Sequence, residues 1–147
     1  MYAKIAVYLK IIVAVLIVAF IGIQFVPVER SNPPVTGEID APPRVKEIFM
    51  RSCYDCHSNE TVWPWYSYIA PASWLLEDDV EEGRDELNFS EWKGYDEKRK
   101  LKKFKEIREE VEEGEMPQWY YIIMHPEAKL SDADKQALFE WTATGGK

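Results

Sequence analysis

The stretch DEKRKLKKFKEIREEVEEG, residues 96–114, decides the fold class of this chain. Its apolar residues recur every three or four positions, at Leu101, Phe104, Ile107 and Val111. This spacing places them on one face of an α-helix, with the many Lys and Glu residues on a solvated face. Gly114 ends the pattern, and glycine is the residue that most easily ends a helix in the left-handed conformation. We therefore predict a helix from about Asp96 to Glu113.

Helical patterns also occur on both sides of this stretch. Before it, we predict a helix that starts at Pro42-Pro43, is capped by Asp40 and buries Val45, Ile48 and Phe49. A second helix is expected over residues 72–87, after a loop rich in Trp and Pro. No segment alternates between apolar and polar residues as a strand would. The predicted fold class is all-α.

The segments that follow residue 114 are predicted to be helical as well. Residues 117–124 are expected to form a short turn of helix. Ser131 is expected to cap a last helix, in which Asp134 three residues later completes a capping box. Ala137, Leu138 and Trp141 would face the core from this helix.

An apolar segment near the start of the chain is long enough to span a membrane. It contains 22 residues from Ile5 to Val26, and Lys10 can extend its amino group toward the headgroups. Bulky residues follow the segment where a signal peptidase would need small ones, so we expect it to be retained as an anchor. Lys4 and Lys10 lie on the N-terminal side of the apolar run, which predicts a cytoplasmic N-terminus. The rest of the chain would lie on the outer, in a bacterium periplasmic, face of a single-pass membrane protein.

Composition limits the function of the part outside the membrane. After residue 26 the chain has 16 basic and 26 acidic residues, a balance of −10. Such a surface disfavours nucleic acid as a partner, because phosphate binding needs positive charge. Five prolines occur within residues 27–43 and indicate an extended linker. We predict an anchor over residues 1–26, a linker over 27–41 and a folded domain over 42–147.

The two cysteines of the chain stand together in Cys53-Tyr-Asp-Cys56-His57. C-x-x-C-H is the attachment signal for c-type haem. Two intervening residues let both sulfurs reach the two vinyl groups on one edge of the porphyrin, and the adjacent histidine can ligate the iron. Covalent attachment also suits a small domain. We therefore predict one covalently attached haem c, bound by Cys53, Cys56 and His57.

Three other interpretations of the motif are weaker. A thioredoxin-like dithiol would open a helix within a βαβ unit, which the pattern lacks. A structural zinc needs four ligands, and His125 as the only further candidate leaves the set one short. A plain disulfide would not need the adjacent His57.

Methionine and histidine are the usual ligands at the sixth position of the iron. The candidates are Met116, Met124 and His125. Met116 stands in Gly114-Glu-Met-Pro117, where glycine and proline restrict the loop, and we predict it as the ligand. Met124 follows two isoleucines and is expected to pack in the core. His125 would be the ligand in a bis-histidine haem.

Many stretches of the chain, from residue 20 to 142, resemble one family: the small haem-binding domain family of bacterial membrane-anchored c-type cytochromes. The matching stretches are Gln24-Phe25, 52–59, 61–67, 69–74, 82–84, 87–92, Gly114-Glu-Met-Pro117, Tyr121, 125–131 and Trp141. The resemblance implies one c-type haem, an N-terminal anchor and a cytochrome c-like helical fold. It also implies that the Met116-Pro117 pair belongs to a sixth-ligand loop.

We expect the protein to act as an electron carrier and not as an enzyme. Iron held by both His57 and Met116 would have no open position for a substrate. The membrane and a redox protein would be its partners. The alternatives are a haem peroxidase, a redox or gas sensor with a labile sixth ligand, and a haem subunit of a larger membrane complex.

Overall fold

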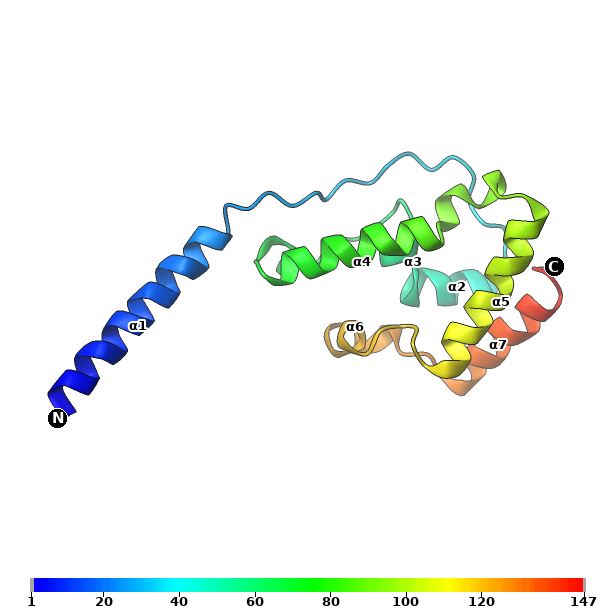
Figure 1. Cartoon of the computed structure of the whole chain (residues 1–147). Coiled ribbons are helices and arrows are strands. Elements are labelled where there is room, and N and C mark those ends of the chain that lie inside the picture. The colour runs from blue at the N-terminus through cyan, green and yellow to red at the C-terminus, as the bar shows by residue number, and fades with distance from the viewer. Residues whose placement is uncertain (1, 147) are drawn as a thin grey trace. The chain divides into compact units, whose positions relative to one another are not determined.

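The computed structural model describes residues 2–146, and within this range it is helical without any β-strand (Figure 1). The predicted all-α fold class is confirmed. In chain order the elements are α1 (Tyr2–Ile23), α2 (Pro43–Ser52), α3 (Tyr54–His57), η1 (Trp65–Tyr68), α4 (Ala72–Glu86), η2 (Phe89–Gly94), α5 (Glu97–Glu113), α6 (Trp119–Met124), η3 (Pro126–Ala128) and α7 (Asp132–Ala143), where η denotes a 3₁₀ helix.

The chain divides into two compact units. The first unit combines the residues up to 31 with residues 63–79, and the second combines residues 32–62 with the residues from 80 onward. Each unit is described by itself. The boundaries predicted at residues 26 and 41 stay a prediction.

The first unit contains the apolar helix α1. Its stretch from Lys4 to Ile23 has a mean hydropathy of 2.8, and none of its most apolar window is buried against the protein. By length and composition this helix can cross a membrane. An isolated helix in water would need a polar face, and α1 has none, so a lipid environment suits it better.

Gln24 follows α1 and makes a paired contact with the loop before α4. Its side-chain amide donates to the carbonyl of Ala70 at 3.2 Å and accepts from the Ala70 amide at 2.9 Å. Arg30 donates to the carbonyl of Ser67 at 3.0 Å, and its guanidinium lies 4.5 Å from the ring centre of Tyr68. These contacts join the end of the apolar helix to residues more than 35 positions away in the sequence.

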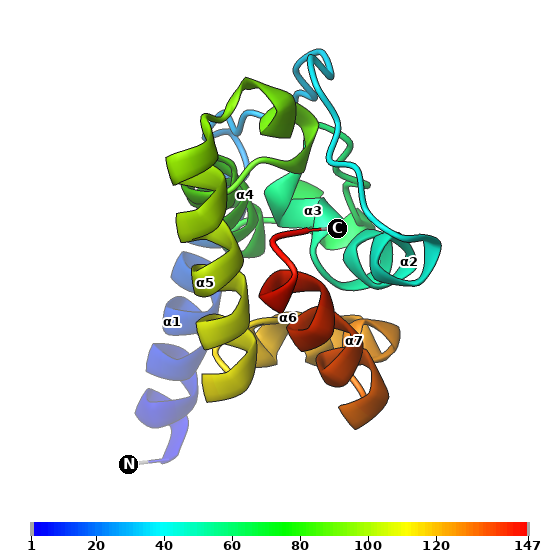
Figure 2. The ribbon, with the colours of Figure 1, turned by 90° about the vertical axis from the view of Figure 1, so that its right-hand side faces the viewer.

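The second unit has one core, to which α2, α5 and α7 contribute (Figure 2). Helix α7 packs against both α5 and α2. The predicted core residues Val45, Ile48 and Phe49 of α2 are buried, as are Leu138 and Trp141 of α7, and Ala137 is partly buried against the core. Phe49 contacts the rings of Phe89 and Trp141, with ring centres 4.5 and 5.3 Å apart.

Helix α5 matches its prediction except at two positions. Asp96 caps it by accepting from the amide of Arg99 at 2.7 Å, and Gly114 ends it at a φ of +82°. Phe104, Ile107 and Val111 are buried, but Leu101 is 62% exposed, so its place in the stripe was predicted wrongly. The buried face of the helix includes Lys103, next to Phe104, in place of Leu101.

The predicted start of α7 is confirmed, and that of α2 is wrong in one detail. Ser131 and Asp134 form the expected capping box, and the Asp134 carboxylate also pairs with Arg44 and Arg51 of α2. Asp40 does not cap α2, because Pro42 occupies the cap position and Pro43 is the first helical residue. A proline there already has the φ that a helix needs, so no side-chain cap is required.

The last residues of the predicted linker belong to the second unit and bind the segment Phe89–Ser90 within it. The amides of Thr36 and Gly37 donate to the carbonyl of Ser90 at 3.1 and 2.8 Å, and that of Ile39 donates to Phe89 at 2.8 Å. Ile39 is 3% exposed and belongs to the core. The sequence did not indicate η2, the 3₁₀ helix to which this segment binds.

Candidate functional site

The attachment motif forms the junction between α2 and α3. Cys53 ends α2 and starts α3, which is one helical turn from Tyr54 to His57. The amides of Cys56 and His57 donate to the carbonyl of Cys53 at 3.2 and 2.9 Å. Residues three and four positions apart share a face of a helix, so this turn brings two cysteines and one histidine to one side. Both cysteines are half-buried, and neither forms a disulfide bond.

The imidazole of His57 is held by the backbone of the second half of α4 and the residue after it. Its Nδ1 lies 2.7 Å from the carbonyl oxygen of Gly83 and 3.1 Å from that of Leu87. Carbonyl oxygens only accept hydrogen bonds, so Nδ1 must carry the proton. Burial lowers the pKa of His57 below 6.5, although both hydrogen bonds oppose this effect. The neutral ring therefore presents the lone pair of Nε2, the arrangement found in metal-ligating histidines.

Gly83 allows α4 to approach the motif closely. A Cβ atom at this position would lie 2.7 Å from the carbonyl oxygen of Cys56 and 3.1 Å from its Cβ. Real Cβ atoms essentially never come so near to backbone. The absence of a side chain at Gly83 is therefore what lets its own carbonyl reach His57.

The two residues between the cysteines tie the motif to other parts of the second unit. The Tyr54 hydroxyl donates to Glu38 at 3.2 Å, and its buried ring stacks on Phe89 with centres 5.3 Å apart. Burial, followed by the charge of Glu38, raises the pKa of Tyr54. The Asp55 carboxylate accepts from the hydroxyl of Tyr121 in α6 at 2.7 Å. The motif is thus fixed from the linker side and from the α6 side.

A network of buried polar groups fixes the chain directly after His57. The Ser58 hydroxyl donates to the carbonyl of Tyr54 at 2.7 Å, and the Asn59 amide donates to the hydroxyl of Ser90 at 2.9 Å. Asn88 donates to the side-chain oxygen of Asn59 at 2.8 Å. Satisfied buried networks of this kind are rigid, because each lost partner would leave a buried polar group unpaired. We therefore expect the backbone directly after His57 to be rigid.

The electrostatics of the thiols do not match those of a reactive dithiol. Burial raises the pKa of Cys53 to about 12 from its ordinary value of 9.0, Cys56 adds to this effect, and Arg51 opposes it. Redox-active cysteines instead have lowered pKa values, because the thiolate is the attacking species. The neutral thiol of Cys53 and the neutral imidazole of His57 fit a bound prosthetic group better.

Met116 lies apart from α3, on the loop between α5 and α6. Its amide donates to the carbonyl of Glu110 at 3.2 Å, as do those of Gly114 and Glu115, so the end of α5 fixes its backbone. Its side chain is half-buried. Tyr121 follows five residues later and binds Asp55. Five residues span at most about 18 Å, which limits how far Met116 can lie from Tyr121.

The two other candidates for the sixth ligand differ in their surroundings. Met124 is 47% exposed, so its expected place in the core was predicted wrongly. His125 stacks on the ring of Tyr121 with centres 4.4 Å apart, and its Nδ1 lies 3.3 Å from Glu127. Because Tyr121 also binds Asp55, His125 lies near the motif. It remains the alternative to Met116.

Sequence reasoning assigned no role to four residues that build this site. They are Gly83, Leu87, Arg84, which donates to Ser58, Asn32 and Thr61, and Tyr121. A glycine in the middle of a helical pattern could have indicated the close approach at Gly83. The contributions of Leu87 and Gly83 are backbone carbonyls, which leave no trace in side-chain chemistry.

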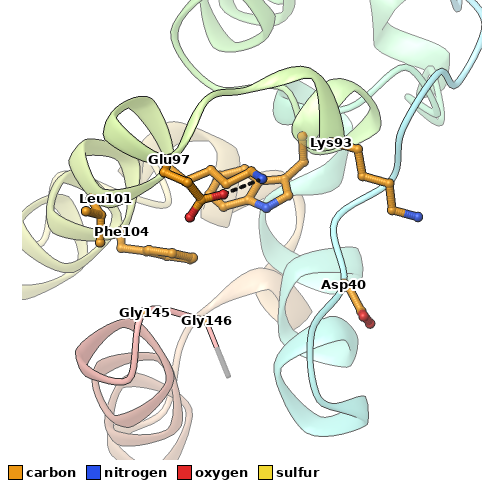
Figure 3. A pocket seen from close by; sticks show the side chains of 9 residues that line it. Asp40, Lys93, Glu97, Leu101, Phe104, Gly145 and Gly146 are labelled. Carbon is orange, nitrogen blue, oxygen red and sulfur yellow. Dashed lines mark hydrogen bonds and ion pairs between the residues drawn. The ribbon is translucent and has the colours of Figure 1, made fainter.

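A separate cavity of about 270 Å³ lies beside α5 (Figure 3). None of the four predicted site residues lines it. Trp92 and Phe104 form its aromatic part, and Glu97 pairs with Lys100 at 3.3 Å on its rim. Leu101, which is exposed although it was predicted to be buried, also borders this cavity.

Two free thiols, an imidazole with an available Nε2 and an all-α domain are the donors and the scaffold of a haem-binding protein. This is the class of protein that the fold and the site define. The chain belongs to the haem-binding domain family, whose model matches residues 18–144. The predicted family and the predicted haem cofactor are thereby confirmed. None of the curated proteins or solved structures with which the chain was compared matches it.

Proposed function

We propose that this protein is a membrane-anchored electron carrier with one covalently attached haem c. The observation that carries the proposal is the geometry of His57. Two carbonyl oxygens hold its Nδ1 proton, which leaves Nε2 to ligate iron, and two free thiols lie in the same turn. The haem would supply a one-electron couple between ferric and ferrous iron.

Cys53 and Cys56 would attach the haem through two thioether bonds. Each thiol would add its S–H across one vinyl group, so that sulfur bonds to one carbon and the proton goes to the other. This addition involves no net oxidation or reduction. The raised pKa of Cys53 keeps the sulfur in the S–H form that the addition consumes.

The residues around the motif would orient the proximal ligand and exclude water. Gly83 and Leu87 fix the plane of the His57 ring, and Phe89 lies 6.3 Å from it, centre to centre. Helix α6 buries none of its six residues although five of them are aromatic or aliphatic. We propose that the porphyrin would cover part of α6, because a large flat ligand needs an apolar surface.

Met116 would complete the coordination of the iron. The support is a half-buried thioether on a loop whose backbone is fixed at Glu110, near a helix joined to Asp55. Iron with two protein ligands has no open position for substrate, which favours electron transfer over catalysis. A thioether ligand also favours ferrous iron and a higher reduction potential.

The apolar helix α1 would keep this carrier at the membrane. Lys4 and Lys10 lie toward its N-terminal end, which favours a cytoplasmic N-terminus and a haem domain on the periplasmic or outer face. The tether would raise the effective concentration of the haem near a redox partner in the same membrane. The acidic surface favours a partner with a basic docking face.

The test is expression of the full chain together with haem-attachment machinery. We expect the intact mass to exceed that of the polypeptide by one haem, and acidified acetone not to extract the colour. Cys56→Ala should leave at most one thioether bond, and the double variant Cys53→Ala with Cys56→Ala should release its haem. A wild-type protein whose haem is extracted completely would refute covalent attachment.

A further inference from the structure

Lys103 is a lysine buried in the second unit, on the core side of α5. Its side chain is only 7% exposed, and its Nζ lies 2.7 Å from a carboxylate oxygen of Glu106 and 3.3 Å from one of Glu86. Lysine is almost never buried unless it is paired. The solvated face predicted for this helix therefore does not include Lys103.

Its partner Glu86 ends the helix that holds His57. Glu86 is the last residue of α4, and the next residue, Leu87, offers its carbonyl to Nδ1 of His57. Leu87 and Phe104, the neighbour of Lys103, belong to the same core cluster. The carboxylate that pairs with Lys103 and the carbonyl that holds His57 thus belong to adjacent residues at the end of α4.

The charge of Lys103 influences the imidazole of His57. Burial is the largest influence that lowers the pKa of His57, but Lys103 lowers it further and exceeds the opposing effect of Glu86. Burial alone would lower the pKa of Lys103 itself, yet Glu106 and Glu86 outweigh it and raise that pKa. Lys103 therefore remains an ammonium at neutral pH and imposes a positive potential at His57.

We propose that Lys103 raises the reduction potential of the haem that His57 ligates. This inference rests on the proposed ligation by His57. Ferric haem carries one more positive charge than ferrous haem, so a buried ammonium nearby disfavours the ferric form. Solvent ions screen a buried charge much less than an exposed one, so the effect persists at high ionic strength.

The experiment is a potentiometric titration of the full-length, haem-loaded protein and its variants. Lys103→Met should favour the ferric form, and a tenfold change in the ferric-to-ferrous ratio would appear as a downward shift of about 59 mV for a one-electron couple. Lys103→Arg keeps the charge and should restore most of the wild-type potential. Glu86→Gln removes the opposing charge and should shift the potential upward, by less because Glu86 is mostly exposed.

The matched control is Lys105→Met on the same helix. Lys105 is 74% exposed and pairs with Glu109 at 3.2 Å, so any shift it causes should vanish at about 1 M salt. A shift for Lys103→Met that also vanishes there, or no shift, overturns the inference. If Lys103→Met fails to fold, Lys103→Gln, which is polar but uncharged, takes its place, and an unchanged potential overturns the inference.

Failure of the proposed function would look different. A wild type without covalently bound haem in its intact mass refutes that function and this inference with it. A wild type with the haem, but with equal potentials in all four variants at high salt, refutes the role of Lys103 alone.

Discussion

Replacing Gly83 by alanine tests whether close packing of α4 on the motif holds the proximal histidine. The new Cβ would lie 2.7 Å from the carbonyl oxygen of Cys56, and that atom is backbone that cannot rotate away. Overpacking costs about 1–3 kcal/mol, and we expect the upper half of this range here. The better helix propensity of alanine returns about 1 kcal/mol. The net loss should be about 1–2 kcal/mol.

The assay is thermal unfolding of the full-length protein, followed by the near-UV circular dichroism of its tryptophans. A loss of this size should lower Tm by roughly 5–10 °C for a domain of about this length. Gly94→Ala is the control, because a Cβ at Gly94 meets nothing within 4 Å. Its Tm should stay within about 2 °C of the wild type, which is the usual range for open surface positions.

The same substitution should loosen His57. In the wild type the carbonyl oxygen of Gly83 lies 2.7 Å from Nδ1 of His57. If α4 moves outward to admit the methyl group of alanine, this distance increases and the hydrogen bond weakens. In the haem-loaded protein we expect a lower yield of attached haem and faster carbon monoxide binding than in the wild type. Equal stability, yield and binding rate in Gly83→Ala and Gly94→Ala would show that the close approach has no role.

Four further predictions follow from other parts of the chain. Met116→Ala should abolish the weak far-red absorption band of methionine-ligated ferric haem and let carbon monoxide bind the ferrous form. Met124→Ala should keep the band, and the reverse result would identify Met124 as the ligand. Asp134→Asn should cost about 2–4 kcal/mol at pH 7, because it leaves Arg44 and Arg51 without their buried partner. Burial alone would raise the pKa of Asp134, but the hydrogen bonds from Ser131 and the two arginines lower it below 3.8. The ionised carboxylate therefore stabilises the fold above pH 3.8, and this stabilisation is lost as the pH falls through the folded-state pKa. Urea titrations at pH 3 and 7 should show this acid-dependent loss of unfolding free energy in the wild type only. Leu138→Ala removes a side chain with 0% exposure and should cost about 2–5 kcal/mol in the same assay, and a cost under 1 kcal/mol would contradict its place in the core. Edman sequencing of the mature protein should start at or near Met1 and the protein should need detergent for extraction, whereas a start after Phe25 would exclude the anchor.

The sequence predicts those parts of the fold that depend on local chemistry. Asp96 and Gly114 bound α5, and Ser131 with Asp134 starts α7, because caps and helix ends use short-range hydrogen bonds. The burial of individual side chains is less predictable. Leu101 has the right spacing for the core but borders a surface cavity, because burial depends on which element packs opposite.

The candidate site divides in the same way. Cys53, Cys56 and His57 follow from a contiguous motif whose chemistry sets its spacing. The groups that act on them are distant in sequence: Gly83 holds His57 through its backbone carbonyl, and Lys103 acts through the charge of its side chain. In a helix with many lysines, the sequence does not indicate which lysine is buried. Only the packing of α5 beside the end of α4 distinguishes Lys103 from Lys105.

The two carbonyl oxygens that hold His57 also decide which side of the haem would be the labile one. The polypeptide orders this ring by itself, so ligation need not fix a free side chain at a cost of about 0.5–1.5 kcal/mol. A haem bound by His57 would therefore meet a ring whose orientation the protein already fixes. Met116, the proposed second ligand, is held through its backbone amide at Glu110, whereas for His57 the ring itself is held. Small molecules should therefore replace Met116 more readily than His57.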